Sequence, residues 1–373
     1  LLLKRKLEDL GLSQVQFLED CAFTIGCLKG NVANKAIGFI AHVDTADYNA
    51  ENIQPQVFEN YDGSDLLLNA EHQIYLRVAD SPNLTDYLGE TLITTDGLTL
   101  LGADDKAGIA EIFAMLRFYV AHPEVSRPDI WVAFGPDEEI GRGADRFPVD
   151  KFPVDFAYTI DSGRVGHFEY ETFNAAKLDL EIKGISVHPG TAYQQMVNAL
   201  KLALEIDAAL PQEAVPEKTR GYEGFYLLHD LNGTIAHATA NYIIRDHDQQ
   251  AFADKKAYLV KVIEKINARY SYDPISYQLT DQYYNIRPIV EKCPASIDLA
   301  IEAMKNLAIE PIIEPFRGGT DGSKISYLGI PTPNIFTGGE NFHGQYEFIS
   351  LQAMEKAAQT LIEIVRLYGK KIK

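Results

Sequence analysis

Short apolar runs alternate with amphipathic stretches through the first half of the chain. Strands are predicted at residues 36–44 (AIGFIAHVD), 129–136 (DIWVAFGP) and 156–161 (FAYTID). A helix is predicted from about Lys106 to Ala121, because apolar residues recur there at helical spacing. This alternation is typical of an α/β protein whose strands and helices pack as a largely parallel sheet.

The pattern changes near Phe173, where strands and helices follow in the order β-α-β-β-α-β. Such a unit fits a small inserted domain with an antiparallel sheet and helices on one side. Its predicted elements are residues 176–185, 196–210, 222–230, 233–246, 252–270 and 275–286.

Helix and strand alternation resumes after Arg287. A helix is predicted at residues 297–309, a Gly-rich run follows, and the chain closes on a long helix with one apolar face. Met354, Ala357, Leu361, Ile364 and Val365 form that face. The sequence therefore predicts a main domain in two parts, 1–172 and 287–373, around an insert at 173–286.

The net negative charge of the chain excludes some classes of binding partner. Asp and Glu outnumber Lys and Arg by 53 to 34, and the formal net charge of -19 argues against nucleic acid or an anionic membrane surface. Cations and small neutral or zwitterionic molecules fit better.

Cysteine usage and the first residues indicate the compartment. Cys21, Cys27 and Cys293 have no metal-ligand spacing, and we interpret them as packing residues of a protein in a reducing compartment. The sequence has no run of about 18 apolar residues, and its charged first residues are helix-like, so a cytoplasmic protein is expected. The start at Leu1, without a helix cap, leads us to expect a preceding segment.

Polar residues follow the predicted strands, where an α/β sheet usually builds its site. His42 and Asp44 lie two residues apart and so share a face of the first strand. Asp44 could therefore hold the second ring nitrogen of a metal-bound His42. Taken alone, an ordinary surface or core pair is the commoner explanation of such a pattern.

Two acidic segments each allow two interpretations. The pair Asp104 and Asp105 precedes the predicted helix, where it could cap the N-terminus or let one carboxylate bridge two metals. Glu138 and Glu139 follow the second strand. If the backbone stays extended, they face opposite ways, so that one can bind metal and the other can face a substrate. A solvated acidic turn is the alternative.

Asp161 and His343 complete the set of candidates. Asp161 ends the third strand, and His343 lies in a Gly-rich loop. Together these clusters supply two imidazoles and several carboxylates, which is the ligand set that a pair of Zn²⁺, Co²⁺ or Mn²⁺ ions would take.

Sequence motifs in a fixed order carry a resemblance to a known family. They are HVDT, TLLGADDKAGIAEI, PDEEIGRGA, YTID, VHPGTA, RGGTDG and FTGGENFHG. From about Ile37 to the final helix, the chain resembles the peptidase T family, the tripeptide aminopeptidase branch of a superfamily of di-zinc peptidases that includes carboxypeptidase G and the aminoacylases. The resemblance implies a three-layer catalytic domain of the zinc-exopeptidase type with a mostly parallel mixed sheet. The insert would be a ferredoxin-like lid domain.

The resemblance also implies two metal ions with one shared ligand. The ligands of the first ion would be His42, Asp104 and Asp161. Those of the second would be Asp104, Glu139 and His343. Asp104 would then bridge the two ions.

Catalytic roles follow from the same resemblance. Asp44 would orient His42, and Glu138 would be the general base. His188 would stabilise the oxyanion from the lid domain, although a turn histidine before proline is the alternative. The peptide bond between Asp104 and Asp105 is expected to be cis.

Three residues are candidates for binding the peptide itself. Asn198, Arg245 and Arg317 would hold its backbone or its carboxylate, since a guanidinium makes paired hydrogen bonds to a carboxylate. Salt bridges to neighbouring aspartates such as Asp246 or Asp321 are the alternative for the two arginines.

The chain departs from the family pattern at a few positions. Tyr346 stands where many relatives have a second histidine, and Ser162 replaces a common glycine. Family members also begin with a helix and a strand that precede the first residue here. None of these is a metal ligand, so the departures bear on fine specificity.

The resemblance implies a cytoplasmic aminopeptidase that removes the N-terminal residue from tripeptides by attack of a hydroxide bridging two Zn²⁺ per subunit. A homodimer through the lid domain is expected. One alternative is a deacylase that acts on N-acyl amino acids or dipeptides. The other is an inactive metal-binding homologue, which would leave Glu138 without a task.

Overall fold

The apolar runs predicted as strands form the centre of a mixed sheet. The computed structural model describes residues 1–33 and 35–370, and the sheet belongs to the first of two compact units into which they divide. This unit 1 comprises Leu1–Tyr170, Ile286–Glu314 and the residues from Thr320 onward. Unit 2 comprises Glu171–Asn285 and Pro315–Gly319, the latter a segment that the sequence pattern gave no reason to separate from its neighbours.

In the main sheet, the neighbouring strands β8, β3, β9 and β15 run parallel, and the pairs towards both edges are antiparallel. The strands in spatial order are β1 (Ser13–Leu18), β2 (Phe23–Leu28), β8 (Asp129–Gly135), β3 (Ala36–His42), β9 (Phe156–Ser162), β15 (Asn334–Phe336) and β10 (Phe168–Glu169). The strand predictions and the α/β class are thus confirmed.

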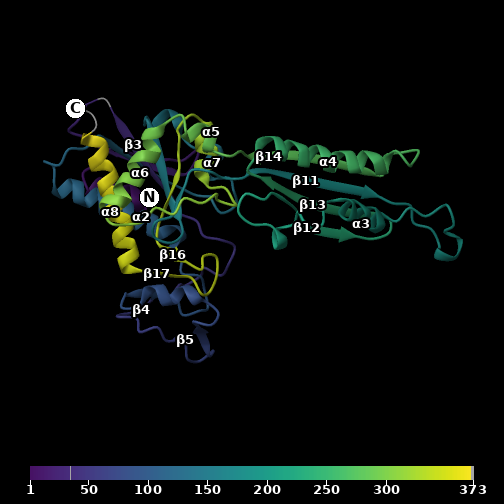
Figure 1. Ribbon diagram of the computed structural model, residues 1–373, viewed down its shortest axis with the longest axis horizontal. Coiled ribbons are helices and arrows are strands. Elements are labelled where there is room, and N and C mark those ends of the chain that lie inside the picture. The colour runs from purple at the N-terminus through teal and green to yellow at the C-terminus, as the bar shows by residue number, and fades with distance from the viewer. Residues whose placement is uncertain (34, 371–373) are drawn as a thin grey trace. The chain divides into compact units, whose positions relative to one another are not determined.

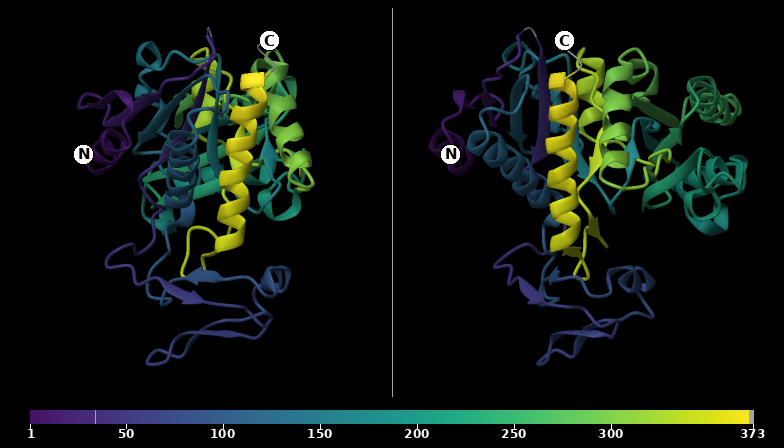
Figure 2. Two further views of the ribbon diagram at one scale, coloured as in Figure 1. Left: turned by 90° about the vertical axis from the view of Figure 1, so that its left-hand side faces the viewer. Right: turned by 60° about the vertical axis from the view of Figure 1, so that its left-hand side comes forward.

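Helices cover both faces of this sheet. The helices of unit 1 are α1 (Leu2–Asp9), α2 (Ala103–Ala121), α5 (Arg287–Val290), α6 (Pro294–Asn306), α7 (Asp321–Tyr327) and α8 (Leu351–Lys370). The face of the sheet that carries Phe39 packs against α2, α6 and α8. On the opposite face, Ile40 packs with Phe152 and with Ile325 of α7. Figure 2 shows α8 between α2 and α6. Burial of both faces explains why these strands are almost continuously apolar.

A second, small sheet in unit 1 was not predicted. It joins β16 (Gly339–Glu340), β17 (Phe348–Ser350), β7 (Leu92–Thr94) and β4 (Gln56–Phe58). A hairpin of β5 (Leu66–Asn69) and β6 (Ile74–Leu76) lies beside it. Figures 1 and 2 place this region at the end of the unit where α8 begins. Because β16 and β17 flank the loop that carries His343, the small sheet fixes both ends of that loop.

Unit 2 is an antiparallel sheet covered by helices on one side (Figure 1). The strands in spatial order are β12 (Phe225–Gly233), β13 (His237–Asp246), β11 (Asn174–Lys183) and β14 (Ile275–Tyr283). The helices α3 (Ala199–Ala209) and α4 (Gln249–Asn267) contact each other and both pack on β11 and β13. The predicted β-α-β-β-α-β order is confirmed.

Two smaller findings complete the fold. The three cysteines are free, with Cys21 and Cys27 buried and Cys293 half-buried. Within residues 1–33 and 35–370, no helix combines the length and apolar character needed to cross a membrane.

Candidate metal centre

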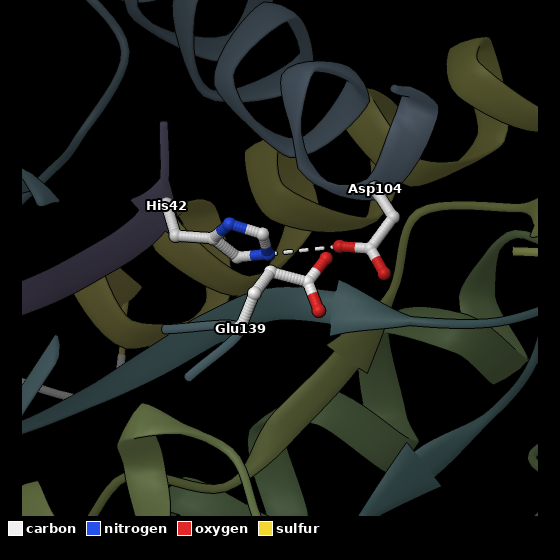
Figure 3. Close-up of side chains that lie close together, drawn as sticks. All are labelled: His42, Asp104 and Glu139. Atoms are coloured by element: carbon white, nitrogen blue, oxygen red, sulfur yellow. Dashed lines mark hydrogen bonds and ion pairs between the residues drawn. The ribbon is translucent and has the colours of Figure 1, made fainter. Parts of the chain in front are cut away.

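The carboxyl ends of the parallel strands bring several candidate ligands to one edge of the main sheet. His42 ends β3, Asp161 lies at the end of β9, and Glu138 and Glu139 come shortly after β8. Asp104 lies at the start of α2. Figure 3 shows the imidazole of His42 and the carboxylates of Asp104 and Glu139 pointing towards one another.

His42 is buried and is held from both sides of its ring. Its Nδ1 lies 3.3 Å from Asp44 Oδ1, and its Nε2 lies 2.8 Å from Asp104 Oδ1 and 3.5 Å from Asp161 Oδ1. Burial opposes protonation, but the surrounding carboxylates outweigh it and raise the pKa of His42 above its ordinary value. The predicted pairing of His42 with Asp44 is present in the structure.

Asp104 faces two histidines that come from distant parts of the chain. Its Oδ1 lies 2.8 Å from His42 Nε2, and its Oδ2 lies 2.8 Å from His343 Nε2. The same nitrogen of His343 is 3.3 Å from Glu139 Oε2. Burial opposes ionisation, but hydrogen bonds with the two imidazoles lower the pKa of Asp104. One carboxylate thus presents one oxygen to each of two ligand groups.

The loop that carries Asp104 is not an ordinary helix cap. Asp104 and Asp105 have non-helical φ/ψ, the peptide bond between them is cis as the family pattern implies, and Asp105 Oδ1 accepts no hydrogen bond. Asp105 is fully buried, and its Oδ2 accepts the N–H of His42 at 3.0 Å. The capping interpretation of the acidic pair therefore does not describe this loop.

Glu138 and Glu139 lie in a turn, so the extended backbone considered from the sequence is wrong here. Asp137 has φ 69°, and Gly141 N–H donates to the carbonyl of Glu138 at 2.6 Å. Asp44 pins this turn, because its carboxylate accepts the N–H groups of Glu138 at 3.3 Å and Glu139 at 3.1 Å. Asp44 thus contacts His42 and also positions both glutamates.

Burial and like charges act strongly on Glu138. They raise its pKa to about 10, with Asp161 and Asp321 contributing most among the charges of the same sign. Nearby cations would reverse this shift and let Glu138 ionise.

The donor set fits divalent cations. In the described part of the chain, no lysine or arginine lies within ion-pair distance of Asp104, Asp161 or Glu139, while Glu139 Oε1 is buried without a hydrogen-bond partner. Ligand atoms of His42, Asp104 and Glu139 lie within 4.8 Å of one another. Buried carboxylates without cationic partners are costly, and two divalent ions would remove that cost.

The supporting roles of three residues were missed from the sequence. Asp105 belongs to a second group with His42 and Asp161 whose ligand atoms lie within 4.8 Å of one another. Asp321 was considered only as a partner of Arg317, yet it accepts the N–H of Ala144 at 3.0 Å beyond the Glu138 turn. The third, Glu347, contacts the Asp104 loop. No sequence signal marks these roles, because each depends on a backbone N–H that the fold brings close.

We expect divalent ions to stabilise the protein more as the pH rises from about 5 to about 8. In the metal-free fold, burial raises the pKa of Glu139 from 4.5 to about 7 and that of Asp161 from 3.8 to about 6. Both carboxyls therefore contribute stability that is complete below their ordinary pKa values and is lost as the pH rises through about 6 to 7. A bound cation favours the carboxylates and offsets that loss.

Thermal unfolding with and without Co²⁺ across this pH range measures the effect. At a free ion concentration of about 100 times Kd, the added stability should reach about 2.7 kcal/mol for each bound ion at the upper end. Glu139→Gln should flatten the pH dependence. A Co²⁺-induced shift in melting temperature that does not change with pH would contradict the expectation.

The remaining candidate residues lie in unit 2. His188 is exposed, and its Nδ1 accepts the N–H of Gly190 at 3.1 Å, which leaves the proton of the neutral ring on Nε2. Asn198 caps α3 by accepting the N–H groups of Leu200 at 3.0 Å and Lys201 at 3.3 Å.

Both candidate arginines have partners within unit 2. Arg245 donates to the carbonyls of Ala176 and Ile244, and the neighbouring Asp246 pairs with Lys255 at 2.8 Å. Arg317 lies over the rings of Phe173 and Phe225, and it donates to Thr219 Oγ1 and to the carbonyls of Gly221 and Glu223. Their roles in binding a peptide stay predictions.

Comparisons with known proteins give a consistent picture. Residues 170–271 match the family model described as peptidase dimerisation domain. The chain is 55% identical over 371 residues to peptidase T from Enterococcus faecalis, covering 99% of this chain and 91% of that protein. It is 52% identical over 368 residues to peptidase T from Fusobacterium nucleatum, covering 98% and 89%.

A solved structure agrees with the fold. A tripeptidase from Staphylococcus aureus superposes with a TM-score of 0.81 at 20% identity, over 99% of this chain and 92% of that one.

Proposed function

The chain belongs to the peptidase T family, and we propose from this premise that it is a metal-dependent aminopeptidase that releases the N-terminal residue of tripeptides. The identity of 50% or more with proteins named peptidase T supports the peptidase activity. The observation that carries the two-ion centre is Asp104, whose two oxygens each lie 2.8 Å from a different histidine.

We propose that two ions, Zn²⁺ in the first instance, share Asp104. His42 and Asp161 would complete the ligands of one ion, and Glu139 and His343 those of the other. The distances support this division, because Asp104 Oδ1 faces the His42 side and Oδ2 faces the His343 side. When bound, such ions supply Lewis-acid chemistry, which polarises a carbonyl and lowers the pKa of water.

Glu138 is the proposed general base. It takes a proton from the attacking water and delivers it to the departing amine, so that the C–N bond breaks without release of an amide anion. Asp44 positions Glu138 through the backbone N–H and orients His42 through Nδ1.

His188 is the proposed donor to the developing oxyanion. Its Nδ1 already accepts a hydrogen bond from Gly190, so the neutral ring presents Nε2–H as a donor. We expect His188→Ala to lower kcat by about 10²–10³-fold, the usual cost of losing one oxyanion donor, and to leave metal content unchanged.

The matched control for His188 is His237→Ala, also an exposed histidine of unit 2, whose ring pairs with Glu181 at 3.5 Å. Steady-state kinetics on a tripeptide compare the two variants. An equal loss in both variants, or a His188 variant with ordinary kcat, would contradict this role.

The remaining parts of the proposal concern peptide binding and the assembly of the enzyme. Asn198, Arg245 and Arg317 are proposed to contact the peptide backbone or carboxylate, as the family pattern implies. We further propose that residues 173–286 form a lid domain between the catalytic parts 1–172 and 287–373, that two copies pair through it, and that the enzyme works in the cytoplasm. The match of residues 170–271 to a dimerisation domain supports the pairing.

Peptide length and a free N-terminus provide the test. Metal-loaded protein is offered a free tripeptide, the matching dipeptide and the N-acetylated tripeptide, and the released amino acids are quantified. Release of the N-terminal residue from the free tripeptide alone supports the proposal. Turnover of the acetylated peptide would favour the deacylase alternative, and no turnover with both ions bound would favour an inactive metal-binding homologue.

A further inference from the structure

Glu347 is a buried carboxylate that the mechanism above does not use. Its side chain is almost inaccessible, at 1% exposure. Oε2 accepts the N–H groups of Leu101 and Gly102 at 2.8 Å each, and Oε1 accepts the N–H of Asp104 at 3.1 Å. All three donors belong to the short segment that presents the shared carboxylate of Asp104.

That segment has an unusual backbone. Gly102 has φ 74°, a conformation that residues with a side chain rarely adopt, and a Cβ there would lie 2.4 Å from Lys106 Nζ. Asp104 and Asp105 are also non-helical, so α2 becomes regular only after them, and the bond from Lys106 N–H to the carbonyl of Gly102 at 3.2 Å uses none of the N–H groups that Glu347 accepts. The backbone donors at a helix start need acceptors, and an anion near the helix N-terminus is favoured. Glu347 provides both.

Glu347 is itself fixed from the other side. Its N–H donates to the carbonyl of Gly344 at 3.2 Å, which closes the turn after His343. The next residue, Phe348, begins β17 and is fully buried. Glu347 therefore stands four positions after His343 on a turn anchored to the small sheet.

The consequence concerns two ligands from opposite ends of the chain. Asp104 and His343 are 239 residues apart in sequence, yet Oδ2 and Nε2 lie 2.8 Å from each other. One side chain, Glu347, joins the backbone that presents the first ligand to the turn that presents the second. Ligands supported in this way bind a metal more tightly, because less ordering is left to the binding step.

We propose that Glu347 is a positioning residue that sets the distance between Asp104 and His343, and so the affinity of the ion that these two share with Glu139. The inference rests on the proposed two-ion function. It predicts a selective effect: loss of Glu347 weakens one ion much more than the ion held by His42 and Asp161.

Calorimetric titration of the metal-free full chain with Co²⁺ tests this. We expect two binding steps in the unchanged protein. In Glu347→Gln, one step should weaken by about 10–100-fold, the usual effect of changing a residue that supports a ligand, while the other step weakens much less. His343→Ala identifies the step, because it should weaken the same one.

Glu90→Gln is the matched control. Glu90 accepts the hydroxyl of Ser350 at 2.5 Å and so supports the far end of β17 without contacting the Asp104 segment. It should leave both steps unchanged. Glu347→Asp, which keeps the charge with a shorter reach, serves if the glutamine variant does not fold, and it should weaken the same step by a smaller factor.

The outcomes distinguish the positioning role of Glu347 from the proposed two-ion function. If both Glu347 variants bind both ions as the unchanged protein does, or lose both steps equally, the positioning role is wrong while the two-ion function stands. If the unchanged protein binds fewer than two ions, or releases no amino acid from a tripeptide, the proposed function itself is wrong.

Discussion

Glu138→Ala is expected to lower kcat for tripeptide hydrolysis by about 10²–10⁴-fold, the usual contribution of a positioned general base. The carboxylate lies on a turn pinned by Asp44, and burial with the nearby Asp161 and Asp321 raises its pKa to about 10 in the metal-free protein. Because Glu138 is not a proposed ligand, both ions should still bind. Steady-state kinetics and metal analysis on the same preparation measure the two effects.

The neighbouring Asp137→Asn is the matched control. Asp137 lies one residue away and pairs loosely with Arg146 at 3.7 Å, and asparagine tolerates its positive φ. Its kcat should match that of the unchanged protein. The general-base role would be wrong if Glu138→Gln kept a near-normal kcat, or if either variant of Glu138 lost its bound ions.

Asp104→Ala is expected to weaken both ions together, each by more than the roughly 10–100-fold that follows the loss of a supporting residue. Both oxygens of Asp104 are committed, at 2.8 Å to His42 and 2.8 Å to His343. Activity should fall with ion occupancy. Titration of metal-free variants with Co²⁺ measures both affinities.

Two variants that each remove a proposed ligand of only one ion give the comparison for Asp104→Ala. Asp161→Ala should weaken only the ion on the His42 side, and Glu139→Ala only the ion on the His343 side. If Asp104→Ala produced the pattern of either single variant, Asp104 would not be shared between two ions.

The sequence predicted the strands that have a strong local signal and the candidate ligands that the fold brings together. The strands β3, β8 and β9 are buried on both faces, so their apolar runs stand out, and the polar residues that end them mark the site. The predicted helix start near Lys106 also matches the point where α2 becomes regular, after the non-helical Asp104 and Asp105.

The small sheet could not be predicted in the same way. β4 and β7 are only three residues long, so the alternation of apolar and polar residues is too short to identify them as strands. β7 also pairs with β17, which lies more than 250 positions later in the sequence. The turn after β8 could not be predicted either. Its positive φ falls on Asp137, whereas glycine is the residue that usually signals such a backbone conformation in a sequence.

Supporting residues are the hardest part of the site to predict. Glu347 and Asp321 act by accepting backbone N–H groups from distant segments, and a backbone N–H carries no residue identity. Family resemblance supplied the proposed ligands and the proposed base, since those roles depend on side chains at fixed motif positions. The contacts that hold the ligands in place become visible only in the fold.

Stepwise loading of the metal-free protein with Zn²⁺, with tripeptide hydrolysis followed at each addition, tests the two-ion aminopeptidase most directly. The account predicts that release of the N-terminal residue rises to its full rate only as the second equivalent binds. Full activity with one equivalent bound, or no activity once two are bound, would contradict it.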